Sequence, residues 1–296
     1  MQPIAAWLVA RPQNGVLGLA GTLLLPLSPI FSGLVMALLS LQYGLRYSAL
    51  QAIAAGTVLA GVALLVNVPV VQILANAGST WLPVIVLGVL LRNWRSLILT
   101  LQVSAIVAGI ATLAFFVVLG DPTDYWNGVV ETLAEVFREN GLAEQAGLLL
   151  ERQAVIVPQM TMLFVFFSWS LYVLVLLLGY ALFQSLPEQA GVFGRFRDLN
   201  FGRVLAGILA VTSVLALVTG AAWLQNVAFV LFAVFWIQGL ALLHWLRAQG
   251  RLPVFVLIAS YALLPILNVV LVVAFAVIGY TDAWFDYRTR GLAKEN

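Results

Sequence analysis

The sequence predicts an all-α fold, a polytopic transmembrane helical bundle of about nine membrane segments with an external amphipathic helical hairpin. Of the 296 residues, 63% are hydrophobic and only 9% are charged, and the mean hydropathy is +1.05. The charges cluster, so that six uncharged stretches of 25 to 45 residues remain between them. Because about 20 apolar residues form a bilayer-spanning helix, each stretch holds one or two membrane segments. We therefore expect a single integral membrane domain over residues 1–296, and we exclude soluble enzymes and nucleic-acid-binding modules.

The counts of cysteine, histidine and basic residues exclude further kinds of site. Cysteine is absent, and His244 is the single histidine. These counts exclude disulfides, Fe–S clusters, zinc–thiolate sites and a bis-histidine haem site. The basic residues are 13 arginines and one lysine, mostly in short loops, a pattern that orients a membrane protein. We expect no cofactor, no metal, no nucleic-acid partner and no enzymatic activity.

The N-terminal part of the chain contains five predicted membrane segments. Pro26 and Pro29 predict a turn between the first two. The N-terminus carries no basic region or cleavage site, so we expect it to belong to the mature first helix. Arg46, Arg92 and Arg95 all fall on one side, which the positive-inside rule assigns to the cytoplasm. The expected segments are near residues 4–24, 30–45, 47–66, 72–91 and 96–118, the fourth of which contains several helix-breaking residues.

Residues 121–157 form the only sizeable polar segment, with seven acidic residues and two arginines. Asn140 and Gly141 end its first helical pattern, and a second apolar run follows. We expect an external amphipathic helical insertion that lies on the outer membrane face or over the mouth of the bundle. The apolar residues at helical spacing are Trp126, Val129, Val130, Leu133 and Phe137.

Three further segments are expected in the C-terminal half. A turn at residues 223–226 joins the second and third of them. The most basic loop, residues 194–203, and Arg247 and Arg251 all fall on the cytoplasmic side. The expected segments lie near residues 158–182, 204–221 and 227–245.

The last hydrophobic run, residues 252–280, permits two interpretations because Pro265 lies at its centre. One is a single kinked helix, whose 29 residues would extend about 43 Å and so would have to tilt. The other is a broken hairpin, which satisfies the positive-inside rule for the basic residues that follow. The side of the polar C-terminal tail, residues 281–296, stays open at this stage.

Candidate ligand-binding residues surround the proline of the last run. Pro265 lacks an N–H group, so the carbonyl of Tyr261 loses its helical partner, and Asn268 follows three residues later. An opened helix supplies oxygen ligands without a buried charge, although a packing kink with a satisfied asparagine is the simpler alternative. Aromatic residues of membrane helices also serve as packing groups or interfacial anchors. The side chains that could line the same cavity are Trp169, Tyr172, Trp236 and Gln238.

The basic loop provides a second kind of candidate site. Arg195, Arg197 and Arg203 suit either anionic lipid headgroups or a cytoplasmic protein partner, and orientation of the protein explains them equally well. On the external segment, three glutamates repeat every four residues, and a solvated helix face is the simplest account of them.

Two short motifs resemble the YybS-like family of uncharacterised bacterial polytopic membrane proteins. The first, Leu41-Gln42-Tyr43-Gly44-Leu45-Arg46, is similar to the family's opening. The second, residues 279–288, is similar to its closing motif, through Gly279, Asp282, Trp284, Asp286 and Arg288.

The resemblance implies a function as well as a fold. The family's first six helices resemble the substrate-binding S component of energy-coupling-factor transporters, and Ala6 and Ala10 resemble the alanine pair that S components use for docking. The resemblance thus implies a transporter-like, small-molecule-binding subunit in the bacterial cytoplasmic (inner) membrane. The alternative is a non-transporting scaffold that recruits envelope or cell-division partners through its cytoplasmic arginine loops. Expected partners are membrane lipids, together with a small-molecule ligand or a membrane or cytoplasmic protein.

Overall fold

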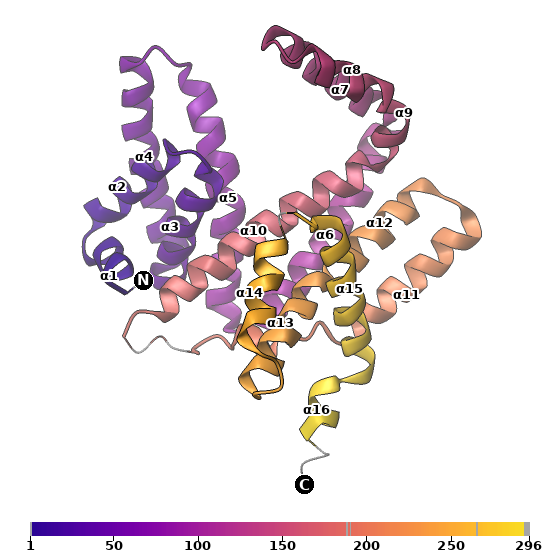
Figure 1. Cartoon of the computed structure of the whole chain (residues 1–296). Coiled ribbons are helices and arrows are strands. Elements are labelled where there is room, and N and C mark those ends of the chain that lie inside the picture. The colour runs from indigo at the N-terminus through magenta and orange to yellow at the C-terminus, as the bar shows by residue number, and fades with distance from the viewer. Residues whose placement is uncertain (1, 188, 190, 265, 293–296) are drawn as a thin grey trace. The chain divides into compact units, whose positions relative to one another are not determined.

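A computed structural model describes residues 2–187, 189, 191–264 and 266–292, without the side chains of 268 and 290–292. Every regular element in these ranges is a helix (Figure 1). The chain divides into two compact units. Unit 1 contains residues 1–104 and 170–199, and unit 2 contains residues 105–169 and 200–296.

Unit 1 is built around α3, which packs against α2, α4 and α5. Buried hydrogen bonds connect these helices: the Trp81 indole N–H donates to Ser32 Oγ (2.8 Å), whose hydroxyl donates to the Leu19 carbonyl (2.9 Å). The helices of unit 1 are α1 (Gln2–Ala10), α2 (Pro12–Leu23), α3 (Ser28–Tyr43), α4 (Leu45–Leu65), α5 (Val70–Trp94), the start of α6 (Leu97–Leu119), the end of α10 (Met160–Gln184) and η2 (Phe196–Asp198).

The predicted first segment, residues 4–24, is wrong as a continuous helix, because α1 and α2 are separated at Arg11. Arg11 is extended, with φ −144° and ψ 146°, and Pro12 follows it. Proline disfavours helical geometry in the residue before it, so the chain breaks there and restarts with the proline in the first turn. The proline turn predicted between the first two segments is present between Leu23 and Ser28.

The fourth predicted segment is one unbroken helix, α5, although Pro83 lies inside it. A proline at this position leaves the carbonyl of Ser79 without its helical N–H donor. The hydroxyl of Tyr172 on α10 donates to that carbonyl (2.8 Å). A side chain of another helix therefore satisfies the group that the proline exposes.

Unit 2 is centred on the pair α13 and α15. The helices of unit 2 are the end of α6, α7 (Thr123–Glu139), α8 (Ala143–Glu151), α9 (Gln153–Ile156), η1 (Val157–Gln159), the start of α10, α11 (Gly202–Thr219), α12 (Ala222–Ala233), α13 (Phe235–Ala248), α14 (Val254–Leu263), α15 (Asn268–Phe285) and α16 (Tyr287–Leu292). The turn predicted at residues 223–226 is misplaced: α11 ends at Gly220, which has φ +65°, and residues 223–226 already belong to α12.

The last hydrophobic run is a hairpin of two helices, not one kinked helix. Leu264, Ile266 and Leu267 lie outside both α14 and α15, and Pro265 lies outside the described residues. In Figure 1, α14 leaves the turn at residues 249–253 and α15 returns, so that α16 lies at the same end of unit 2 as that turn. With 10 residues, α14 extends only about 15 Å, half of a hydrocarbon core.

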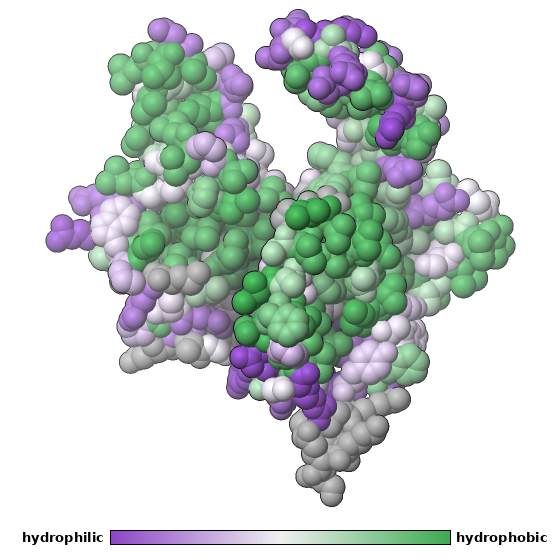
Figure 2. All heavy atoms as spheres, in the orientation of Figure 1, coloured by the Kyte–Doolittle hydropathy of each residue, from purple (hydrophilic) through white to green (hydrophobic). Residues whose placement is uncertain are grey.

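Two amphipathic helices, α7 and α8, pack against each other, and α7 ends before the predicted Asn140-Gly141 stop. The Trp126 indole N–H donates to Thr161 Oγ1 (2.8 Å), which fixes α7 beside the start of α10. Figure 2 shows hydrophilic residues gathered on α7 and α8. Their position outside the membrane stays a prediction.

Among the described residues, six helical segments are long and apolar enough to cross a membrane, and three shorter apolar helices accompany them. Figure 2 shows apolar side chains over α4 and α5 and over α14 and α15. Leu65 and Leu217, for example, are 83% and 86% exposed, which suits a lipid surface and not water. The chain is therefore an all-helical membrane protein, and the total of about nine segments stays a prediction.

Candidate functional site

The candidate site of unit 1 begins at the C-terminal end of α3, where the helix leaves carbonyl groups without intrahelical donors. Arg92, from the last turn of α5, donates through Nη1 to the carbonyls of Leu41 and Gln42, the latter at 2.7 Å. The cation also complements the negative end of the helix dipole. Gly44, with φ +80°, makes the approach feasible, because a Cβ atom there would lie 3.2 Å from Arg92 Nε.

Arg95 differs from Arg92 in that its guanidinium makes no hydrogen bond or ion pair with any described residue. It ends α5 in the left-handed conformation (φ 52°), and its backbone N–H donates to the Leu91 carbonyl (2.9 Å). Its side chain is exposed. The group is therefore placed by the backbone but remains available to a ligand.

An aromatic wall faces these arginines. The rings of Phe183 and Phe193 stack at 5.5 Å with an interplanar angle of 5°. The Tyr180 hydroxyl donates to the Gly194 carbonyl (2.7 Å) and accepts from the Phe193 N–H (3.1 Å). The Leu97 N–H donates to the Phe193 carbonyl (2.9 Å), so both backbone groups of Phe193 are fixed.

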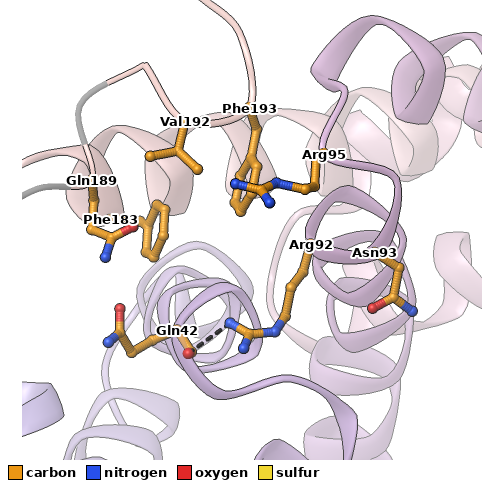
Figure 3. A pocket seen from close by; sticks show the side chains of 8 residues that line it. All are labelled: Gln42, Arg92, Asn93, Arg95, Phe183, Gln189, Val192 and Phe193. Carbon is orange, nitrogen blue, oxygen red and sulfur yellow. Dashed lines mark hydrogen bonds between the residues drawn. The ribbon is translucent and has the colours of Figure 1, made fainter.

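Together these groups line an open cavity of about 500 Å³, a volume within the usual range for small-molecule sites. Figure 3 shows the guanidinium groups of Arg92 and Arg95 reaching from α5 toward α3 and the loop that carries Phe193. The Oε1 atom of Gln42 is buried and has no hydrogen-bond partner among the described residues. The lining residues, none of them acidic, are Gln42, Arg92, Asn93, Arg95, Phe183, Gln189, Val192 and Phe193.

Unit 2 contains a buried polar cluster, formed by Asn200, Gln238, Asp282 and Arg288. The fully buried amide of Gln238 accepts from the Phe201 N–H (2.7 Å) and donates to Asn200 Oδ1 (3.2 Å) and Asp282 Oδ2 (2.8 Å). Both of its N–H groups are therefore used within the protein.

The carboxylate of this cluster is also fully enclosed. Asp282 Oδ2 lies 3.4 Å from Arg288 Nη2, and Asp282 Oδ1 accepts from the Tyr287 N–H (3.2 Å). Asp282 is 0% and Arg288 9% exposed. The cluster thus connects α13, α15, α16 and the start of α11. Two residues of the closing motif, Asp282 and Arg288, form an internal ion pair in it.

A close crossing of α13 and α15 supports the cluster. A Cβ atom on Gly239 would lie 2.1 Å from the Phe275 carbonyl oxygen, and one on Gly279 would lie 2.2 Å from the Phe235 carbonyl oxygen. Neither position accommodates a side chain without separating the helices. This contact explains Gly279 in the closing motif.

The structure places the remaining ligand candidates in separate environments. Tyr172 bonds to Ser79, as described above, and the Tyr261 hydroxyl lies 2.8 Å from His244 Nε2. Trp169 and Trp236 are buried, and Trp236 Nε1 has no hydrogen-bond partner among the described residues. The side chain of Asn268 lies outside the described residues. The four cavities described in the units are lined by other residues, and the ligand-binding role of this set stays a prediction.

The arginines of the basic loop are accessible. Arg195 and Arg197 have exposed side chains, 63% and 39%, and each lies about 4 Å from the Asp198 carboxylate. Arg203 is exposed in the first turn of α11. In the closing motif, Trp284 packs edge-on against Tyr280 (6.3 Å), and Asp286 ends α15 with φ 44°.

Sequence reasoning assigned Arg92 and Arg95 only to membrane orientation and did not identify the cavity. A usable signal was present, because two arginines three residues apart at a helix end place two cations on neighbouring positions. The other lining residues come from distant segments and carry no local pattern. Among the described residues, no group of three or more His, Asp or Glu side chains could hold a metal ion.

Comparison with known proteins gives one match. The family described as "Predicted membrane protein (DUF2232)" matches residues 15–283, a range that includes residues 41–46 and the first half of the closing motif, residues 279–283. No curated protein and no solved structure gives a significant match.

Proposed function

Because this chain belongs to the DUF2232 family of predicted membrane proteins, we propose a function that a multi-pass membrane protein performs through a polar cavity. The function is transporter-like binding of a small molecule, without catalysis. The protein acts in the bacterial cytoplasmic membrane. The end of unit 1 that carries Arg46, Arg92 and Arg95, its arginine-rich end, lies in the cytoplasm. This proposal extends the resemblance to transporter S components.

The cavity of unit 1 is the observation that carries the proposal. It combines an aromatic wall with five polar or charged side chains, which can fix the orientation of a polar ligand. Its wall is held by three hydrogen bonds around Phe193 and Tyr180, so binding requires little ordering of the protein. The buried Gln238 amide offers no comparable site, because its oxygen and both of its N–H groups are bonded within the protein.

The test is native mass spectrometry of the full-length protein, gently extracted from its own membrane. We expect a stoichiometric small molecule, and we expect Val192→Trp, which fills the cavity, to remove it. Val71→Trp is the matched control, because Val71 belongs to the same unit and is 80% exposed away from the cavity. An absent small molecule, or equal loss in both variants, would overturn the proposal. Alanine variants of Trp236 and Asn268 test the residues that the sequence suggested.

A second candidate function is the non-transporting scaffold, which the exposed guanidinium groups of Arg195 and Arg197 favour. Such groups suit a cytoplasmic protein partner or anionic headgroups. The same spectra decide between the two functions. A reproducible protein partner on an empty cavity, lost in the double variant Arg195→Gln and Arg197→Gln, would favour the scaffold.

A further inference from the structure

The cavity of unit 1 carries an excess of positive charge among the described residues. Arg92 and Arg95 both line it, and no acidic side chain in the described part of the chain does. The imbalance extends through the unit, whose residue ranges contain six arginines but only two acidic residues. Uncompensated charges at a partly enclosed site attract a counter-ion.

The two arginines are arranged for complementary tasks. Arg92 is held by two carbonyls of α3, which fixes its guanidinium at the cavity wall. The Arg95 guanidinium makes no hydrogen bond or ion pair with a described residue, although the backbone N–H of Arg95 is held at the end of α5. The guanidinium of Arg92 is held in place and that of Arg95 is available to a ligand. Together they suit a polyanionic group, because each offers several N–H donors in a planar arrangement.

From these observations we infer that the cavity binds a phosphate ester, with its phosphate on Arg95 and Arg92 and its organic part against Phe183 and Phe193. The inference rests on the proposed function and names the class of its ligand. Two cations match the charge of a phosphate ester more closely than that of a single carboxylate. A hydroxyl on the same ligand would satisfy the buried Oε1 atom of Gln42.

Phosphate esters reach this site from two sources. The cavity lies at the arginine-rich end of unit 1, where the positive-inside rule places the inner leaflet's headgroups, so the ester belongs either to an anionic lipid or to a phosphorylated solute of the cytoplasm. Both present the same chemistry to Arg95.

The experiment uses the full chain in phosphatidylcholine nanodiscs and measures calorimetric binding of phenyl phosphate, with benzyl alcohol as the neutral comparison. We expect phenyl phosphate to bind, benzyl alcohol to bind at least tenfold more weakly, and Arg95→Gln to weaken phenyl phosphate about tenfold or more. Arg46→Gln is the matched control: it removes an exposed cation from the same unit, but Arg46 does not line the cavity. Arg95→Lys should retain part of the affinity, because it keeps the charge but loses the fork.

Nanodiscs with one fifth phosphatidylglycerol distinguish the two sources. If this lipid weakens phenyl phosphate binding about tenfold in the native chain but not in Arg95→Gln, the ligand is a lipid headgroup. If it has no effect, the ligand is a soluble phosphate ester. Thermal unfolding of every variant confirms that it is folded.

Three results would overturn the inference: no binding of phenyl phosphate, equal binding of the neutral probe, or equal weakening by Arg46→Gln and Arg95→Gln. The proposed function fails separately. If native mass spectrometry finds a ligand that Val192→Trp removes but phenyl phosphate does not bind, the cavity is a binding site for another chemical class. If both fail, unit 1 is not the binding unit.

Discussion

Units 1 and 2 use similar polar residues at helix ends in opposite ways. In unit 2, the Gln238 amide and the Asp282 carboxylate bond to each other, to Arg288 and to backbone groups in a buried cluster. In unit 1, the Arg95 guanidinium makes no hydrogen bond or ion pair with a described residue, and Arg92 lines the same cavity while it donates to the end of α3. The residue type therefore does not decide whether a polar group in a membrane bundle holds the fold or binds a ligand. What decides is whether the other helices supply its partners.

The largest expected effect is the loss of the Asp282 carboxylate. Asp282→Ala leaves the buried Arg288 guanidinium and the Gln238 amide without their shared partner, and such a loss costs about 3–5 kcal/mol of unfolding free energy. Thermal unfolding and SDS titration in detergent measure it. Asp286→Asn is the control, because it removes the same charge four residues away, outside the cluster, and asparagine tolerates the left-handed conformation of this position. Equal destabilisation by both variants would show that the cluster does not hold unit 2.

The close crossing of α13 and α15 gives the next effect. Gly239→Ala places a Cβ atom against the Phe275 carbonyl and should cost about 1–3 kcal/mol through overpacking. Gly207→Ala in α11 is the matched control, since nothing lies within 4 Å of that position. We expect the control to be neutral or slightly stabilising, because alanine favours helix more than glycine does. The same unfolding assays compare the two, and a neutral Gly239→Ala would contradict the tight crossing.

Unit 1 offers a smaller effect that separates stability from binding. Tyr180→Phe removes the hydroxyl that holds Gly194 and Phe193, and should cost about 1–2 kcal/mol while loosening the aromatic wall. Unfolding and phenyl phosphate titration together measure this. Tyr47→Phe serves as the reference, because the Tyr47 hydroxyl makes no hydrogen bond with a described residue. Unchanged binding in Tyr180→Phe would mean that the wall contributes nothing to the cavity.

The smallest effect concerns the start of α7, at the edge of unit 2. The pKa of Asp121 is lowered because its carboxylate accepts from the Thr123 hydroxyl (2.6 Å) and the Thr123 N–H (3.0 Å). A lowered pKa stabilises this turn at neutral pH, and the contribution disappears as the pH falls through that pKa. Thr123→Val should return the pKa toward its ordinary value. Carbon NMR of labelled aspartate measures it, and an identical titration in both proteins would rule out the hydroxyl bond.

Much of the helical layout could be predicted because it depends on local signals. The uncharged runs predicted most of the apolar helices, and the Asn140-Gly141 pair predicted the end of α7. The break at Arg11 was equally local, since Pro12 marks it, but the long apolar run hid it. The turn was predicted at residues 223–226 instead of Gly220 because the polar residues at the start of α12 resembled a loop.

The sites were harder to predict because they depend on contacts between distant segments. Gln238 was identified as a polar residue within a span, but its partner Asp282 lies 44 positions further along the chain. The cavity joins α3, the end of α5 and the loop at residues 189–193. No spacing rule connects such segments, so only the folded chain shows which polar groups meet.

The hairpin of α14 and α15 bears on which side of the membrane the C-terminal tail reaches. We predict no net transfer between compartments over residues 254–285, because the half-length α14 leaves one end of unit 2 and α15 returns to it. A reporter inserted in the turn at residues 249–253 and one fused to the C-terminus should therefore read the same side of the membrane. In that topology Arg288 lies on the same side of the membrane as Arg251 of the preceding turn. The polar tail then needs no translocation across the membrane during biogenesis.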